Sequence, residues 1–366
     1  MPGQGLPCPY EKNRSGCAEV GYTPIAQKWQ PHRDHAMLGS DVNWEELLLT
    51  EQLHGLVIRT QSGFFTVQTP QGPIVCQLRG RLKENTLETD LIALGDRVIL
   101  ERLERDADTV GGVIVAVEER ERVLSRVAPH SAVGTSAERE QVIIANPDQA
   151  VFVFSAANPA PHTRMLDRFL VAAEKAEIPD IRVCVNKIDL VADDPSDTRV
   201  TFQVYEDIGY PVLYVSAATG EGIDALHEAL TGKISVFTGP SGVGKTSLLN
   251  AIEPDLGRRV NEVSQVTTKG RHTTRYSELV PLAGGGYIAD TPGIRAISPW
   301  DVEPDELDGY YVEIAARVPD CKFQDCGHTH EPGCAVRVAV ERGEINPERY
   351  DSYLRLREAL EAEYVY

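Results

Sequence analysis

A glycine-rich segment at residues 239–246 carries the most specific chemical signal in the sequence. It reads GPSGVGKT, follows an apolar run at residues 234–238, and precedes a helix-like stretch. Glycines let backbone N–H groups close around phosphate oxygens at the N-terminus of a helix, whose dipole favours anions. We therefore predict a phosphate-binding loop in which Lys245 contacts the β- and γ-phosphates and Thr246 binds Mg²⁺. The predicted nucleotide-binding residues of this loop are Gly239, Pro240, Ser241, Gly242, Val243, Gly244, Lys245 and Thr246.

Two further polar elements follow apolar runs and indicate recognition of guanine. Residues 186–189 read NKID and follow the run 181–185, and residues 216–217 read SA and follow the run 212–215. An N-K-x-D sequence alone is a weak signal that also fits a helix cap. Two such elements after two successive predicted strands are far more specific.

Each residue of these two elements has a predicted role. The carboxylate of Asp189 can accept from both the ring N–H and the exocyclic amine of guanine, a donor pattern that adenine lacks. We expect Asn186 to brace the base site and the stem of Lys187 to pack along the base. The backbone of Ser216 and Ala217 is expected to contact the guanine oxygen.

A fourth element, at residues 290–293, reads DTPG and follows the apolar run 287–289. It matches the D-x-x-G pattern, in which Asp290 would hold Mg²⁺ through water and the N–H of Gly293 would sense the γ-phosphate.

The polar stretch KGRHTT at residues 269–274 lies between the phosphate loop and this fourth element. It stands where a switch with a second Mg²⁺ ligand is expected. Thr273 and Thr274 are both candidates, and Thr273 is favoured. An ordinary surface loop is the alternative.

No glutamine follows the D-x-x-G element to position an attacking water, because Gly293 is followed by Ile294 and Arg295. The site should therefore turn over slowly unless a partner completes it. Our hypothesis is that His272 orients or deprotonates the water, since imidazole accepts protons near neutral pH. Contact with RNA is the alternative role for His272.

The order of these elements is unusual. In ordinary GTPases the phosphate loop precedes the N-K-x-D element, whereas here it follows. A circularly permuted domain explains this order, because the termini of a compact domain usually lie close together. The permutation also leads the chain from Gly293 directly into the C-terminal region, so a nucleotide-driven change could move that region.

A cluster of cysteines and histidines near the C-terminus predicts a structural zinc site. Cys321, Cys326, His328 and Cys334 form a Cys₃His set that suits tetrahedral Zn²⁺ with no open position. His330 is an alternative fourth ligand, and buried free thiols are the alternative to a metal. With the other cysteines scattered, the pattern favours a reduced compartment over a disulfide framework.

Three kinds of element must position these residues. Residues 51–127 contain five short apolar runs separated by turn signals, which favours an OB-fold barrel, with a β-module of packing role as the alternative. Residues 141–298 alternate strand-like and helix-like stretches, as in an α/β domain with a parallel sheet. Residues 299–366 are predicted to be mostly helical, with an amphipathic terminal helix at 347–363. Residues 1–50 read as a flexible extension.

The charge composition limits which partners the chain can bind. The 366 residues include 36 Lys and Arg against 55 Asp and Glu, a formal charge of −19, which alone argues against nucleic acid. Residues 51–126 are nearly balanced, with 10 basic and 12 acidic residues. Local clusters could still bind RNA phosphates, because distant charge is screened beyond ~8–10 Å. The candidates are Arg79, Arg81 and Lys83, together with Lys269, Arg271 and Arg275.

No apolar run reaches the ~20 residues that span a bilayer, and the N-terminus lacks a signal peptide's apolar stretch. We expect a cytoplasmic monomer that makes no membrane contact.

Taken together, the motifs resemble the family of small-subunit-dependent ribosomal GTPases called RsgA or YjeQ. The resemblance covers residue 51 to the C-terminus and is most specific in the zinc segment, CKFQDCGHTHEPGC at 321–334. It extends the phosphate-loop match to Ser247, and 270–274 (GRHTT) and 290–293 (DTPG) also match. Arg275 stands where the family often carries a third threonine.

The resemblance implies a GTPase that binds the 30S subunit late in its maturation. The barrel and the zinc domain would contact 16S rRNA, and hydrolysis of GTP to GDP would time release. One alternative is an RNA-binding adaptor that is switched by GTP without significant catalysis. Another is a GTPase of metal handling, with the cysteines as a metal relay.

Overall fold

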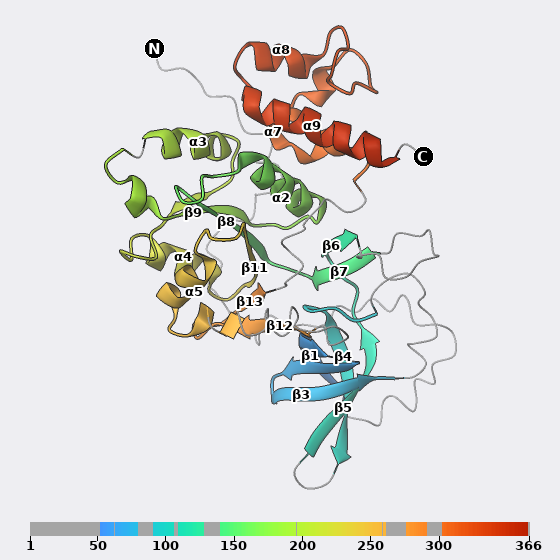
Figure 1. The fold of residues 1–366 in the computed structure, drawn as a ribbon. Coiled ribbons are helices and arrows are strands. Elements are labelled where there is room, and N and C mark those ends of the chain that lie inside the picture. Colours follow the sequence, from blue (N-terminus) through green and yellow to red (C-terminus); the bar gives the residue numbers. More distant parts are fainter. Residues whose placement is uncertain are drawn as a thin grey trace, which may run out of the picture.

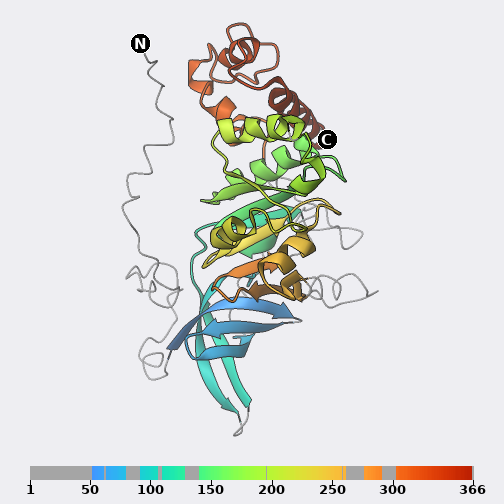
Figure 2. The same ribbon diagram turned by 90° about the vertical axis from the view of Figure 1, so that its left-hand side faces the viewer.

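The computed structural model places three parts in a row, a barrel, a central α/β domain and a helical C-terminal domain (Figures 1 and 2). The structure describes residues 52–61, 63–79, 91–105, 109–127, 140–194, 196–257, 259–260, 276–290 and 302–364. The predicted extension at 1–50 and the predicted switch at 269–274 lie outside these residues.

The N-terminal part is a closed five-stranded barrel. Its strands follow the order β1-β2-β3-β5-β4, and β4 pairs again with β1 to close the circle. Val57, Val67, Val98 and Ile114 are fully buried in its core. This confirms the predicted OB-type barrel. The strands are β1 (Gln52–Gln61), β2 (Phe64–Thr69), β3 (Gly72–Leu78), β4 (Arg97–Arg105) and β5 (Thr109–Val117).

A two-stranded antiparallel ribbon follows the barrel, and the sequence patterns did not predict it. It consists of β6 (Val123–Val127) and β7 (Glu140–Ala145). Ile144 is fully buried and belongs to the core of the α/β domain. The ribbon therefore links the two parts through packing as well as through the chain.

The central domain is a sheet with helices on both faces. Its strands follow the order β10-β9-β8-β11-β13-β12, and β12 alone of these described strands runs antiparallel to its neighbour within the domain. Along β8, Phe152 and Phe154 face one core, and Val151 and Val153 face the other. Burial on both faces explains why these strands read as continuous apolar runs.

The elements of this domain are as follows. The strands are β8 (Gln149–Ser155), β9 (Ile181–Asn186), β10 (Val212–Tyr214), β11 (Ile234–Thr238), β12 (Tyr276–Pro281) and β13 (Tyr287–Asp290), and the helices are α2 (Thr163–Lys175), α3 (Ser196–Asp207), α4 (Ile223–Leu230) and α5 (Lys245–Ile252).

The barrel and the central domain share one hydrogen-bonded sheet. The end of β1 pairs antiparallel with β12, in the register Arg59↔Glu278, Thr60↔Ser277 and Gln61↔Tyr276. The result is an eleven-stranded sheet that runs through both parts.

The C-terminal domain is mostly helical, as predicted. Its elements are η6 (Leu307–Tyr310), α7 (Val312–Ala315), η7 (Val318–Asp320), α8 (Ala335–Glu341) and α9 (Pro347–Tyr364). It packs on α2, on the side of the central domain away from the barrel (Figure 1).

A buried ion-pair cluster anchors this domain. The guanidinium of Arg349 on α9 lies 2.6 Å from Asp167 of α2 and 2.7 Å from Glu313 of α7. The three side chains are at most 7% exposed. The hydroxyl of Tyr205 donates to Asp167 at 2.8 Å, and the ring of Tyr311 lies under the guanidinium.

We predict that Arg349→Ala destabilises the attachment of the C-terminal domain by about 3–5 kcal/mol, because two buried carboxylates lose their counter-charge. Denaturant unfolding followed by tyrosine fluorescence measures the change. Arg164→Ala is the matched control, since the Arg164–Asp351 pair is exposed and should contribute under about 1 kcal/mol. Equal effects of the two substitutions would contradict this account.

Candidate nucleotide-binding site and metal centre

The predicted phosphate loop joins β11 to the N-terminus of α5, as the motif requires. Gly239 lies so close to β8 that an added Cβ would stand 1.9 Å from the carbonyl oxygen of Val153. Gly244 has φ of +94°, and a Cβ there would stand 2.4 Å from Nδ2 of Asn186. Glycine is therefore required at both positions by the tight packing of the loop.

The ammonium of Lys245 lies inside the curve of the loop. Its Nζ donates to the carbonyl oxygens of Gly239 at 2.7 Å and Pro240 at 2.8 Å. A cation is thus held where the loop's N–H groups and the α5 dipole also favour an anion. Thr246 follows in the first turn of α5.

The side chain of Asn186 joins three loops at the carboxyl edge of the sheet. Its Nδ2 donates to the carbonyl oxygen of Val243 at 2.8 Å, and its Oδ1 accepts from the N–H of Ala217 at 3.2 Å. Asn186 is 1% exposed, so both bonds are shielded from water. The structure thus brings the predicted base-reading elements and the phosphate loop together.

Lys187 connects the same edge to a loop that the sequence motifs did not single out. Its backbone is left-handed, with φ of +65°, and its Nζ donates to the carbonyl oxygens of Gly242, at 2.7 Å, and of Asn158. Asn158 belongs to the loop between β8 and α2. The sequence signal that could have identified this loop is its position after an apolar run, because the other loops of the site also follow apolar runs.

The remaining base-reading residues are also adjacent. The hydroxyl of Ser216 donates to the carboxylate of Asp189 at 2.6 Å. The same oxygen accepts from the N–H groups of Ala218 and Thr219 at 3.3 Å and 3.1 Å. Ser216 is fully buried and so holds the half-buried Asp189 in a fixed orientation.

The Mg²⁺ elements are only partly described. Asp290 ends β13, which is the neighbour of β11, so its backbone lies at the same edge of the sheet. Gly293, His272, Thr273 and Thr274 lie outside the described residues, and their roles stay predictions.

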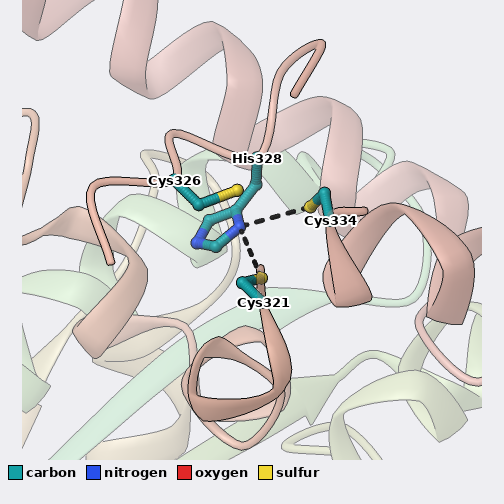
Figure 3. Close-up of side chains that lie close together, drawn as sticks. All are labelled: Cys321, Cys326, His328 and Cys334. Atoms are coloured by element: carbon teal, nitrogen blue, oxygen red, sulfur yellow. Dashed lines mark hydrogen bonds between the residues drawn. The ribbon is translucent and has the colours of Figure 1, made fainter. Parts of the chain in front are cut away.

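The predicted metal ligands form a compact cluster in the C-terminal domain (Figure 3). One ligand atom from each of Cys321, Cys326, His328 and Cys334 lies within 4.8 Å of the others. The Nδ1 atom of His328 is 3.6 Å from Sγ of Cys321 and 3.4 Å from Sγ of Cys334. Three sulfurs and one imidazole nitrogen fit a tetrahedral zinc ion. The alternative ligand, His330, is exposed and outside the cluster.

Surrounding groups orient the histidine. Its Nε2 lies 3.1 Å from the carboxylate of Asp308, which leaves Nδ1 facing the sulfurs. The backbone of His328 is left-handed, with φ of +60°, and the hydroxyl of Tyr350 donates to its carbonyl oxygen at 2.5 Å.

The loop between the ligands is closed by Glu331. Its carboxylate accepts from the N–H groups of Gly327, Thr329 and His330 at 2.8–3.0 Å. Burial alone would raise the pKa of Glu331, but these N–H groups prevail and lower it to about 2. Burial raises the pKa of the Cys326 thiol to about 12.

Two family models match the chain, one over the GTPase domain and one over the barrel. A family model described as RsgA GTPase matches residues 117–300, and one described as RsgA N-terminal domain matches residues 54–111. This chain belongs to the RsgA GTPase family. This family consists of GTP hydrolases, so membership implies that GTP, GDP and Mg²⁺ are the ligands of the site. The resemblance found in the sequence motifs is thus confirmed.

Relatives in this family match over nearly their whole length. Proteins named small ribosomal subunit biogenesis GTPase RsgA include that of Gemmatimonas aurantiaca, 42% identical over 85% of this chain and 99% of the relative. That of Chlorobaculum parvum is 40% identical over 86% of this chain and 100% of the relative.

Two solved structures are similar in fold. YjeQ from Thermotoga maritima has a TM-score of 0.68 and 36% identity, and covers 85% of this chain and 99% of its own. YloQ, described as a circularly permuted GTPase, has a TM-score of 0.66 and 30% identity, and covers 86% and 97%. The predicted circular permutation is thereby confirmed. Among the residues that the structure describes, no helix is long and apolar enough to cross a membrane.

Proposed function

We propose that this chain hydrolyses GTP in the late maturation of the small ribosomal subunit. In this proposal the small subunit stimulates hydrolysis, and hydrolysis releases the chain from the subunit. The observation that carries the proposal is the full-length match to relatives named for small-subunit biogenesis, with a barrel, a permuted GTPase and a Cys₃His domain in one order. In this proposal the three domains span residues 51–127, 141–298 and 299–366.

Steady-state GTP hydrolysis with and without purified 30S subunits tests the proposal. We expect slow hydrolysis alone and stimulation of at least tenfold by 30S, because no described or predicted site residue is a glutamine that could position water. ATP and 50S subunits serve as controls. Equal rates with and without 30S would refute the proposed role, and absence of phosphate release would favour a non-catalytic adaptor.

In the proposed guanine site, Asp189 reads the ring N–H and the amine, while Asn186, Lys187, Ser216 and Ala217 fix its surroundings. The hydrogen bond from the Ser216 hydroxyl to Oδ1 of Asp189 supports this role, because it fixes the orientation of the carboxylate.

Asp189→Asn should therefore exchange guanine for xanthine specificity. An amide offers one donor and one acceptor, which suits the ring N–H and the carbonyl that xanthine has in place of the amine. We expect the affinity for GTP to fall at least a hundredfold and that for XTP to rise, measured by competition against a fluorescent nucleotide. Asp193→Asn, the same chemical change at an exposed carboxylate outside the predicted site, is the control for general damage. Unchanged preference for GTP would remove Asp189 from the base site.

In the proposed phosphate site, residues 239–247 bind the phosphates. Lys245 stabilises the transferred charge, Thr246 and Thr273 bind Mg²⁺, and Asp290 and Gly293 act on the metal and the γ-phosphate. The position of Lys245 against the loop carbonyls supports its part, and the others rest on the sequence.

His272 is proposed to orient or deprotonate the attacking water. His272→Ala should then slow single-turnover hydrolysis on 30S at least a hundredfold while leaving 30S binding intact. His330→Ala, an exposed histidine outside the metal cluster, is the matched control. A normal rate with normal binding would leave His272 with a contact role only.

The Cys₃His cluster is proposed to hold one structural Zn²⁺. We expect about one equivalent of zinc by elemental analysis and loss of helical signal in the C-terminal domain on chelation. Cys326→Ser should release zinc, whereas Cys184→Ser, which alters a buried thiol of the GTPase core, should retain it. Zinc that exchanges freely would point to metal handling instead.

The barrel and the zinc domain are proposed to contact 16S rRNA. Phe64 is 48% exposed on β2 and offers a face for a base. Of the basic candidates, Arg79 is described and its guanidinium pairs with Glu101 at 3.2 Å, so part of its charge is already neutralised.

A further inference from the structure

Strand β1 changes partners along its length. Its first half, Gln52–Leu56, pairs with β4 and closes the barrel, whereas Arg59–Gln61 pairs with β12 of the GTPase sheet. The other edge of the second half stays on β2 of the barrel. One strand thus belongs to both domains.

A β-bulge lies where the partner changes. Val57 faces Val67 and Arg59 faces Thr66, so Ile58 is one extra residue against β2. A bulge bends a strand and increases its twist, which directs the end of β1 out of the barrel toward β12.

The bulge also divides the side chains between two cores. Val57 is fully buried in the barrel core. Leu56 and Ile58, on either side of it, pack against the GTPase core, to which Leu279 of β12 and Ala289 of β13 belong. β1 therefore contributes apolar side chains to the GTPase core as well as backbone pairing with β12.

The turn at Leu94–Asp96 holds the bulge in place. The N–H of Val57 donates to the carbonyl of Asp96, and the N–H of Gly95 donates to the carbonyl of Val57, both at 2.9 Å. Gly95 has no room for a side chain, since a Cβ would stand 2.0 Å from the carbonyl oxygen of Ala145 in β7. The barrel end of the junction is thus rigid.

The other end of the junction reaches the nucleotide site. In β12, Glu278 faces Arg59 of β1 on one side and Asp290 of β13 on the other. β13 is paired with β11, which leads into the phosphate loop. Asp290 is thus separated from the barrel by a single intervening strand.

We propose that the pairing of β1 with β12 couples the nucleotide in the GTPase site to the position of the barrel. In this proposal a bound γ-phosphate shifts the position of the end of β13. Because β12 is paired with β13 and with Arg59–Gln61 of β1, the shift passes through β12 to the barrel. Coupling is reciprocal, so a partner that binds the barrel changes the nucleotide preference. The inference rests on the proposed function for Asp290 and for the partner of the barrel.

The C-terminal domain is attached in a different way. Arg349 holds it to α2 through buried ion pairs, and α2 is a helix on the face of the sheet and not one of its strands. The hypothesis that the nucleotide moves this domain through Gly293 therefore concerns a separate route.

A reversible cross-link tests the coupling on the isolated full-length chain. Thr60→Cys with Ser277→Cys places a disulfide across the two strands at a directly opposed pair. We expect oxidation to change the ratio of the dissociation constants for GDP and a non-hydrolysable GTP analogue about fivefold or more, and reductant to restore it. A ratio constant within twofold would overturn the proposal.

The matched control is Gln52→Cys with Glu101→Cys, an opposed pair on β1 and β4 inside the barrel, which should leave the ratio unchanged. Zinc content is checked after oxidation to show that the metal cysteines are intact. An equal effect of both cross-links would assign the change to general stiffening of β1 and overturn the coupling.

Hydrogen exchange provides a second measurement without any cross-link. In the wild-type chain, amides at 59–61 should exchange at different rates with GDP and with the analogue, while those at 52–56 should not. Ile58→Ala should abolish the difference, and Leu53→Ala, whose side chain packs on the barrel core, should retain it. Identical exchange at 59–61 in both nucleotide states would overturn the proposal. Neither experiment uses ribosomes, so a failure of the proposed ribosomal role is seen separately, as absence of stimulation by 30S.

Discussion

The buried side chain of Asn186 is the contact on which the nucleotide site depends. Its amide binds the phosphate loop on one side and the base-reading loop on the other, through Val243 and Ala217. Both partners are backbone groups in a dry environment, where an unpaired polar group costs about 1–3 kcal/mol. The loops are therefore fixed relative to each other before any ligand is considered, and Lys187 and Ser216 extend the same network.

This arrangement also explains why permutation leaves the site intact. The site is made where β9, β10 and β11 end at one edge of a parallel sheet. What matters is which strands are neighbours, and hydrogen bonds between strands do not depend on the order in which the chain visits them. The chain ends of the permuted domain are then used for new attachments, the barrel before β8 and the metal domain after β13.

The sequence predicted the parts of the structure that rest on local patterns. The strand at Ile234–Thr238 has the bounds of the apolar run seen in the sequence, and the four predicted metal ligands lie together. Burial on both faces of β8 and β11 made those strands readable as apolar runs. The sequence placed His328 in the ligand set with His330 as an alternative, and the structure supports His328 through its left-handed turn and the carboxylate of Asp308.

Contacts between distant segments were not predictable in the same way. Nothing local in β1 marks Ile58 as a bulge, and β12 carries no sequence signal for β1 as its partner, so the pairing of the two strands is visible only in the folded chain. The Arg349 cluster likewise joins residues from three helices. In the sequence, Arg349 is one of several charged residues on its helix, and such a pattern indicates a side chain exposed to solvent. The roles of His272 and Thr273 rest on sequence alone, since they lie outside the described residues.

The junction between β1 and β12 has a consequence for biosynthesis. The five barrel strands are complete once the chain has reached Val117, so the barrel can form early as the chain leaves the ribosome. The second half of β1 must then present an open strand edge until Tyr276–Pro281 has been made, because its partner lies far along the chain. Arg59 and the polar side chains beside it at Thr60 and Gln61 suit that interval, since charge and polarity on an open edge disfavour pairing with a neighbouring nascent chain. The strand that joins the barrel to the GTPase sheet is thus also one whose second partner is made late.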